Sequence, residues 1–139
     1  MTYKIIGKYI KDLKFSIPNA KVCFSLSKDI ANYKINIDIK SNQIKENIIE
    51  VLTSLRLMPT KNDSEKIETN IVYCSVVELT KKNINKNEME KIVLIEVPSE
   101  VYSELRKIFV NLFENSGFKD IKISESVDFQ ELYNRKRIQ

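Results

Sequence analysis

The chain has 139 residues, and a domain of this size buries roughly two-thirds of the surface that its unfolded chain exposes, so one sizeable core is available. Only two glycines and three prolines interrupt an apolar fraction of 42%, which argues against long disordered tracts. The formal charge is +4, but 19 of the 23 basic residues are lysine, whereas phosphate recognition favours arginine. We interpret the basicity first as solvated surface, with a basic nucleic-acid-binding module as the alternative.

The residue types that most enzymes and metal sites need are missing. The chain has no histidine, and Cys23 and Cys74 are isolated from each other, so no metal cluster and no Cys/His pair is indicated. Capping and solvation explain most of the carboxylates. We therefore expect no catalysis, no cofactor and no metal. The charged N-terminus and the lack of a membrane-length apolar run predict a soluble cytoplasmic protein.

Four segments in the first half alternate apolar and polar residues with period two, which predicts strands over residues 3–17, 33–40, 47–58 and 67–79. One face of the first segment carries Tyr3, Ile5, Tyr9, Leu13, Phe15 and Ile17, and Gly7 indicates a bulge in it. Pro18 to Ala20 predict a turn. Because no helical pattern separates the four segments, we expect an antiparallel sheet.

The period changes to that of a helix after residue 80. Asn87 with Glu90 predicts a capped helix start, and Pro98 predicts a kink or stop. Apolar residues from Val101 to Phe113 recur at helical spacing, and Gly117 is placed as a stop. A second capping box, Asp128 to Glu131, begins a short last helix. The whole is one α+β domain, residues 1–139, with strands at about 3–80 and helices at about 88–137.

The residues from Tyr3 to Ala20 resemble the first strand of the SecB export chaperone family. The matching positions are Tyr9, Lys11, Asp12, Leu13, Phe15, Pro18, Asn19 and Ala20. Further matches follow in order at Val76-Val77, Val97-Pro98, Gly117-Phe118 and Val127–Tyr133. The resemblance spans the chain from Tyr3 to Tyr133 and agrees with the predicted order of strands and helices.

The resemblance implies a SecB-like fold, with a four-stranded antiparallel sheet, a long kinked helix and a short C-terminal helix. It also implies an ATP-independent holdase that assembles as a homotetramer, a dimer of dimers. Such a chaperone binds unfolded polypeptides or preproteins in apolar grooves, either for export or for a dedicated client such as the antitoxin of a toxin–antitoxin–chaperone system. A pure assembly protein without a client is a further alternative.

The resemblance and the apolar patterns together select candidate residues. For the client-binding groove they are Val76, Val77, Ile121, Ile123, Phe129, Leu132 and Tyr133. For the oligomer interface they are Tyr9, Tyr102, Leu105, Phe109 and Leu112. Simple core packing is the alternative for both sets. Of the acidic residues with which the family docks the SecA ATPase, Asp12 is retained, and Glu68 is a candidate substitute. Lys81-Lys82 and Arg135–Arg137 are interpreted as solvated charges, with acidic clients or RNA as alternatives.

Overall fold

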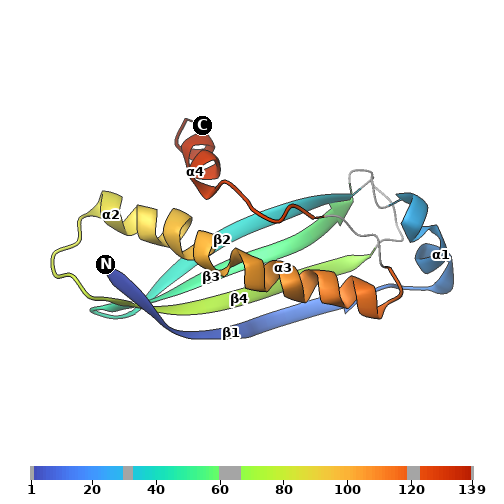
Figure 1. Cartoon of the computed structure of the whole chain (residues 1–139), viewed down its shortest axis with the longest axis horizontal. Coiled ribbons are helices and arrows are strands. Elements are labelled where there is room, and N and C mark those ends of the chain that lie inside the picture. Colours follow the sequence, from blue (N-terminus) through green and yellow to red (C-terminus); the bar gives the residue numbers. More distant parts are fainter. Residues whose placement is uncertain (1, 30–32, 60–66, 119–122, 139) are drawn as a thin grey trace.

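The sheet has four antiparallel strands, as predicted. In the computed structural model, which describes residues 2–29, 33–59, 67–118 and 123–138, the strands are β1 (Tyr3–Ser16), β2 (Tyr33–Lys45), β3 (Ile48–Pro59) and β4 (Glu68–Leu79). Their order across the sheet is β1-β4-β3-β2, so β1 and β2 are the two edge strands (Figure 1). The period-two pattern predicted for residues 67–79 is confirmed in β4, because its alternate residues from Thr69 to Val77 are buried.

A helix, α1 (Ala20–Asp29), lies between the first two strands. The prediction of four successive strands without a helix between them is therefore wrong at this point, and so is the prediction of a simple turn after Pro18. Asn19 caps the helix, because its Oδ1 accepts a hydrogen bond of 2.9 Å from the backbone N–H of Val22. Asparagine is favoured both in turns and at helix caps, so the sequence alone does not distinguish a turn from a helix start at this point.

Two shifts in the pairing of β1 with β4 decide which β1 residues face the helices. One lies between Ile5 and Gly7, which confirms the bulge predicted at Gly7, and the other lies between Ile10 and Asp12. Each shift moves the following residues to the opposite face. Tyr9 therefore lies opposite Cys74 on the face away from the helices, contrary to the prediction that it shares a face with Phe15.

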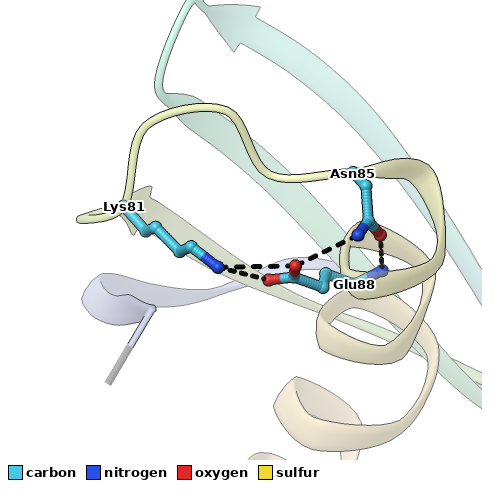
Figure 2. A network of polar contacts seen from close by, with 3 residues as sticks. All are labelled: Lys81, Asn85 and Glu88. Carbon is cyan, nitrogen blue, oxygen red and sulfur yellow. Dashed lines mark hydrogen bonds and ion pairs between the residues drawn. The ribbon is translucent and has the colours of Figure 1, made fainter.

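The long helix begins two residues earlier than predicted. Asn85 is its cap: Oδ1 of Asn85 accepts from the backbone N–H of Glu88 at 2.8 Å, and the Asn85 amide donates to the Glu88 carboxylate, which also binds Lys81 (Figure 2). The sequence contains Asn three residues before Glu at both Asn85 and Asn87, and the earlier pair is the one used.

From this cap the helix continues as α2 (Lys86–Lys91), a π-helical turn η2 (Ile92–Glu96) and α3 (Val97–Asn115). Pro98 does not end the helix. It stands in the first turn of α3, directly after the wider π turn, which accommodates a residue that has no N–H to donate. Gly117, with φ +91°, follows the last turn of α3, as predicted.

The last helix, α4 (Phe129–Ile138), is capped by Asp128, whose Oδ1 accepts from the backbone N–H of Glu131 at 3.0 Å. This confirms the predicted helix start at Asp128, whereas the Glu131 carboxylate accepts a hydrogen bond of 2.6 Å from Arg135. Figure 1 shows α3 running along the sheet and α4 set apart from it beside the helix layer.

The core lies between the sheet and the long helix, in two clusters. The larger one packs Phe109 and Phe113 of α3 on Leu55 and Ile71 of the sheet. The smaller cluster is formed by Ile49, Val51, Val77, Ile92, Val93 and Val97. The opposite face of the sheet is open, with Tyr9 and Met58 there 45% and 40% exposed.

Candidate polypeptide-binding groove

The edge strand β2 carries a row of isoleucines on the face of the sheet that holds the core. Ile35 pairs with Leu57, and Ile37 pairs with Leu55, and both of these β3 residues are buried. The long helix packs over β3 and β4 through α3 and contacts β2 through η2, so the β2 row is left partly uncovered. Ile35 is 37% exposed, and Ile37 and Ile39 are half-buried. Apolar side chains are thus available to a ligand along this edge of the sheet.

The row leads into a hollow of about 340 Å³ between β2 and the start of the long helix. Ser41, the next β2 residue on the same face, lines it together with Ile84, Met89, Glu90, Val93 and Leu94. We call the row Ile35, Ile37 and Ile39 together with this hollow the β2 groove. It is mostly apolar, so it suits apolar side chains of an extended chain.

The C-terminal helix borders the groove. The hydroxyl of Tyr133 donates a hydrogen bond of 2.6 Å to Oε2 of Glu90, which lines the hollow. Phe129 packs its ring edge-on against Tyr102 of α3, with centroids 6.0 Å apart. A hydrogen bond and an aromatic contact therefore help to hold α4 on the long helix.

The segment before α4 is fixed to α3 as well. The hydroxyl of Tyr102 donates to the carbonyl of Ser124 at 2.8 Å, and Nε of Arg106 donates to the carbonyl of Ile123 at 3.2 Å. Burial raises the pKa of Tyr102, and the neighbouring Arg106 opposes that rise. The Tyr102 hydroxyl is therefore a stable donor at neutral pH.

The predicted groove residues do not form one surface. Val77 is buried beneath η2, whereas Val76 lies opposite Gly7 on the other face of the sheet. Ile123, Phe129 and Tyr133 are buried within the chain, and Leu132 is half-buried. Ile121 lies outside the described residues. The sequence reasoning did not select the β2 isoleucines as candidates, although their strict alternation is the clearest strand pattern in the sequence.

The predicted interface residues are divided in a similar way. Tyr102, Leu105 and Phe109 are at most 3% exposed within the single chain. Packing on the sheet accounts for Leu105 and Phe109, and packing against Phe129 and the segment before α4 accounts for Tyr102. Leu112 is half-buried, and Tyr9 is exposed on the open face. The exposed apolar residues of β1 that the sequence did not single out for an interface are Ile6, Ile10 and Leu13, at 50%, 45% and 40%.

The two candidate docking acids share the open face without being adjacent. Asp12 pairs with Val72, whereas Glu68 pairs with Ser16. Four residues along a strand correspond to roughly 13 Å.

The described part of the chain contains no group of three or more His, Cys, Asp or Glu residues that could hold a metal ion. None of the described helices is long and apolar enough to cross a membrane. Cys74 is fully buried, and burial raises the pKa of its thiol, which keeps it protonated and a weak nucleophile.

Over its residues 1–139 the chain matches the family described as "Preprotein translocase subunit SecB". It belongs to the SecB family. A protein of Pelagibacter ubique that is named as a SecB protein-export protein is 41% identical over 134 residues, which are 96% of each chain. The SecB protein-export protein of Rhodospirillum rubrum is 30% identical over 135 residues, covering 97% of this chain and 81% of that one.

Among solved structures, the chain resembles a SecB-like chaperone of Mycobacterium tuberculosis in complex with a peptide from an antitoxin. The TM-score is 0.68 at 8% identity, and the match covers 91% of this chain and 88% of the other. The likeness establishes a SecB-like fold for the sheet, the long helix and the C-terminal helix.

Proposed function

We propose that this SecB-family chain is an ATP-independent holdase that binds unfolded preproteins through the β2 groove and keeps them competent for export. The observation that carries the proposal is the row of partly exposed isoleucines on β2, next to an apolar hollow. The relative with 41% identity over nearly the whole chain bears a protein-export name, and this favours export clients over a dedicated antitoxin client. The nucleic-acid-binding alternative has no support from the family assignment.

The chemistry of the groove fits a client without a fixed sequence. Burial of apolar surface is non-directional, and each large apolar side chain that leaves water contributes roughly 1.5 to 3 kcal/mol. Several such side chains of an unfolded client could be held along Ile35, Ile37 and Ile39 at once. Capture of this kind requires no bond chemistry and no nucleotide.

In this proposal α4 is a lid. It is fixed by the Tyr133 to Glu90 hydrogen bond and by the contact of Phe129 with Tyr102. The released Phe129 and Tyr133 side chains would add apolar surface beside the groove. Undocking α4 would therefore lengthen the binding surface toward α3.

The proposed assembly is a dimer of dimers, in which β1 and the adjoining surface of α3 contribute to contacts between copies. Support comes from the exposed Ile6, Ile10 and Leu13 on edge strand β1 and from the half-buried Leu112 on α3. Docking of SecA on the open face through Asp12 and Glu68 is a weaker part of the proposal, because these acids lie apart.

The experiment that tests the holdase is suppression of aggregation of a slow-folding denatured protein. The variant Ile35→Ser with Met89→Ser should lose most of the suppression, because it makes both parts of the groove polar. Phe24→Ser is the matched control: it removes an apolar side chain that is 80% exposed on α1. Suppression that is absent from the wild type, or equal in the groove and control variants, would contradict the proposal.

A further inference from the structure

A row of side chains with N–H donors crosses the open face of the sheet. Lys14 of β1 pairs with Asn70 of β4, Asn70 with Arg56 of β3, and Arg56 with Asn36 of β2. Directly paired residues point to the same face, and neighbouring strands are roughly 4.8 Å apart. Four donor groups, two of them cationic, therefore lie side by side across the whole sheet.

These donors are not used within the described part of the chain. Neither Lys14 nor Arg56 forms an ion pair with a described residue, whereas Lys4, Lys8 and Lys11 of β1 each have a carboxylate partner. Oδ1 of Asn70 is buried between them and has no hydrogen-bond partner there. A buried polar atom without a partner is uncommon. Because Oδ1 is an acceptor, the group that would satisfy it is a donor such as a backbone N–H of a bound polypeptide, and not a carboxylate.

The surface around the row is hollowed on both sides. A hollow of about 630 Å³ includes Arg56, Asn70 and Asn36, and another of about 470 Å³ includes Lys14, Arg56 and Asn70. Arg56 and Asn70 border both, so the row has room for a ligand group above it. A guanidinium fork holds a carboxylate through two parallel hydrogen bonds, and the flanking amides and ammonium can supply further donors.

The surrounding charges distinguish a polypeptide from a nucleic acid. Asp12 and Asp38 lie in the next row toward the middle of the sheet, beside Val72 and Ser54, and Glu68 borders the smaller hollow. The larger hollow also contains Lys11 and Lys40, so its charges are mixed, and a polyanion laid across this face would meet carboxylates as well as cations. A polypeptide can place one acidic side chain on the row and basic or neutral side chains over Asp12 and Asp38.

We propose that the row Lys14, Asn70, Arg56 and Asn36 is a docking site for an acidic side chain, Asp or Glu, of a mixed-charge polypeptide segment of a partner protein. The carboxylate lies on the Arg56 guanidinium, between Lys14 and Asn36 and above the Asn70 amide. The site is on the opposite face of the sheet from the β2 groove, so a client and this partner can be bound at the same time. The proposal does not rest on the holdase function.

The test is an NMR titration of the full chain, following the side-chain amide signals of Asn36 and Asn70. The probe is a short acetylated and amidated peptide of serine and lysine with two central glutamates. The comparison ligands are the same peptide with glutamines, inorganic phosphate and an oligothymidylate. Arg56→Gln with Lys14→Gln is the site variant, and Lys82→Gln with Lys107→Gln is the control with the same change of charge.

The glutamate peptide is expected to shift both amide signals, and the glutamine peptide to leave them in place. The site variant should weaken binding by about tenfold or more, because two charged donors are lost, while the control variant binds as the wild type does. Added salt should weaken binding in the wild type. Aggregation suppression should be unchanged in the site variant, which separates this site from the groove.

No shift with the glutamate peptide, or equal shifts with the glutamine peptide, would overturn the proposal. So would tighter binding of oligothymidylate, which would assign the row to nucleic acid, or an equal response to phosphate, which would reduce it to a general anion site. Should the double variant be poorly folded, Asn36→Asp on the edge strand gives a second test, because a carboxylate placed there must repel the peptide.

Discussion

Glu104 links three elements through one carboxylate. It accepts hydrogen bonds of 2.6 Å from Nζ of Lys8 on β1 and from the hydroxyl of Tyr73 on β4. The Lys8 hydrogen bond, followed by that from Tyr73, lowers the pKa of Glu104 below its ordinary value. A carboxyl group with a lowered pKa in the folded state contributes stability above its unfolded pKa and loses it as pH falls through the folded pKa.

Glu104→Gln should therefore reduce the free energy of unfolding by about 1 kcal/mol at neutral pH, a modest loss because the side chain is 42% exposed. The difference from the wild type should shrink as pH falls below the usual range of glutamate. Urea denaturation at neutral and acidic pH measures both values. Glu114→Gln, an exposed change on the same helix, is the control. A difference that does not depend on pH would contradict this account.

Thr53 contrasts with Glu104, because its buried hydroxyl makes no hydrogen bond to a described residue. The residue is fully buried between the two core clusters, and Oγ1 has no hydrogen-bond partner among the described residues. Thr53→Val keeps the shape and the strand preference and removes the desolvated hydroxyl. We expect the free energy of unfolding to rise by about 1 kcal/mol. Guanidinium denaturation should show a higher midpoint at an unchanged slope.

The contrasting variant is Tyr73→Phe, which removes a hydroxyl that does have a partner, Glu104. It should lower the midpoint of the same denaturation curve. If Thr53→Val were destabilising to a similar extent, the hydroxyl would have to be hydrogen-bonded in solution.

The structural role of a single residue could be predicted where its own side-chain chemistry determines that role. Gly117 adopts a φ that only glycine accepts easily, and Asp128 caps α4 with its own side chain, so both were predicted correctly. Asn85 and Asn87 offer the same spacing to a glutamate, and nothing local distinguishes them. The bulge at Gly7 moves Tyr9 to the open face, and a second bulge, near Lys11, returns Phe15 to the helix face. No glycine marks the second bulge, so nothing in the sequence indicates that Tyr9 and Phe15 lie on different faces.

At the scale of elements, the hydrogen bond from Tyr133 to Glu90 is one of the contacts that hold α4. Tyr133→Phe deletes the hydroxyl that binds Glu90 and keeps the ring. Backbone amides of α4 should exchange with solvent about fivefold faster, as expected for the loss of one hydrogen bond worth about 1 kcal/mol, while those of α3 stay protected. Tyr3→Phe, which removes a hydrogen bond of 3.1 Å to Glu100, is the matched control. Equal exchange of α4 in both variants would argue against a lid held by Glu90.

The strands themselves were predictable because a half-buried sheet imposes period two on the sequence, as the β4 residues from Thr69 to Val77 show. The groove was not. The position of the long helix on the sheet determines which strand keeps its apolar face uncovered. That position is set by tertiary packing and not by the local sequence pattern. The alternation of Ile35, Ile37 and Ile39 predicts one apolar face and does not say what covers it. The helix α1 was missed because Pro18 and Asn19 suit a turn equally well.

At the scale of the molecule, the remaining exposed apolar surface of β1 has to be explained. The predicted α+β fold, with a four-stranded antiparallel sheet, a long helix and a short C-terminal helix, is confirmed. Ile6, Ile10 and Leu13 nevertheless stay about half exposed on an edge strand. An uncovered edge with apolar side chains favours pairing with another copy. Apolar burial at such a contact also supplies the main driving force for association.

We therefore expect the wild type to have the mass of a tetramer in light scattering, and Ile10→Glu with Leu13→Glu to shift it toward dimers or single chains, because charges would be buried at the contact. Ile44→Glu is the control: it places the same charge on a residue that is 55% exposed at the other edge strand. A wild-type chain that stays monomeric at all concentrations would contradict assembly through β1. It would leave these side chains as additional binding surface for clients, which the aggregation assay with the Ile10 and Leu13 variant would then detect as lost suppression.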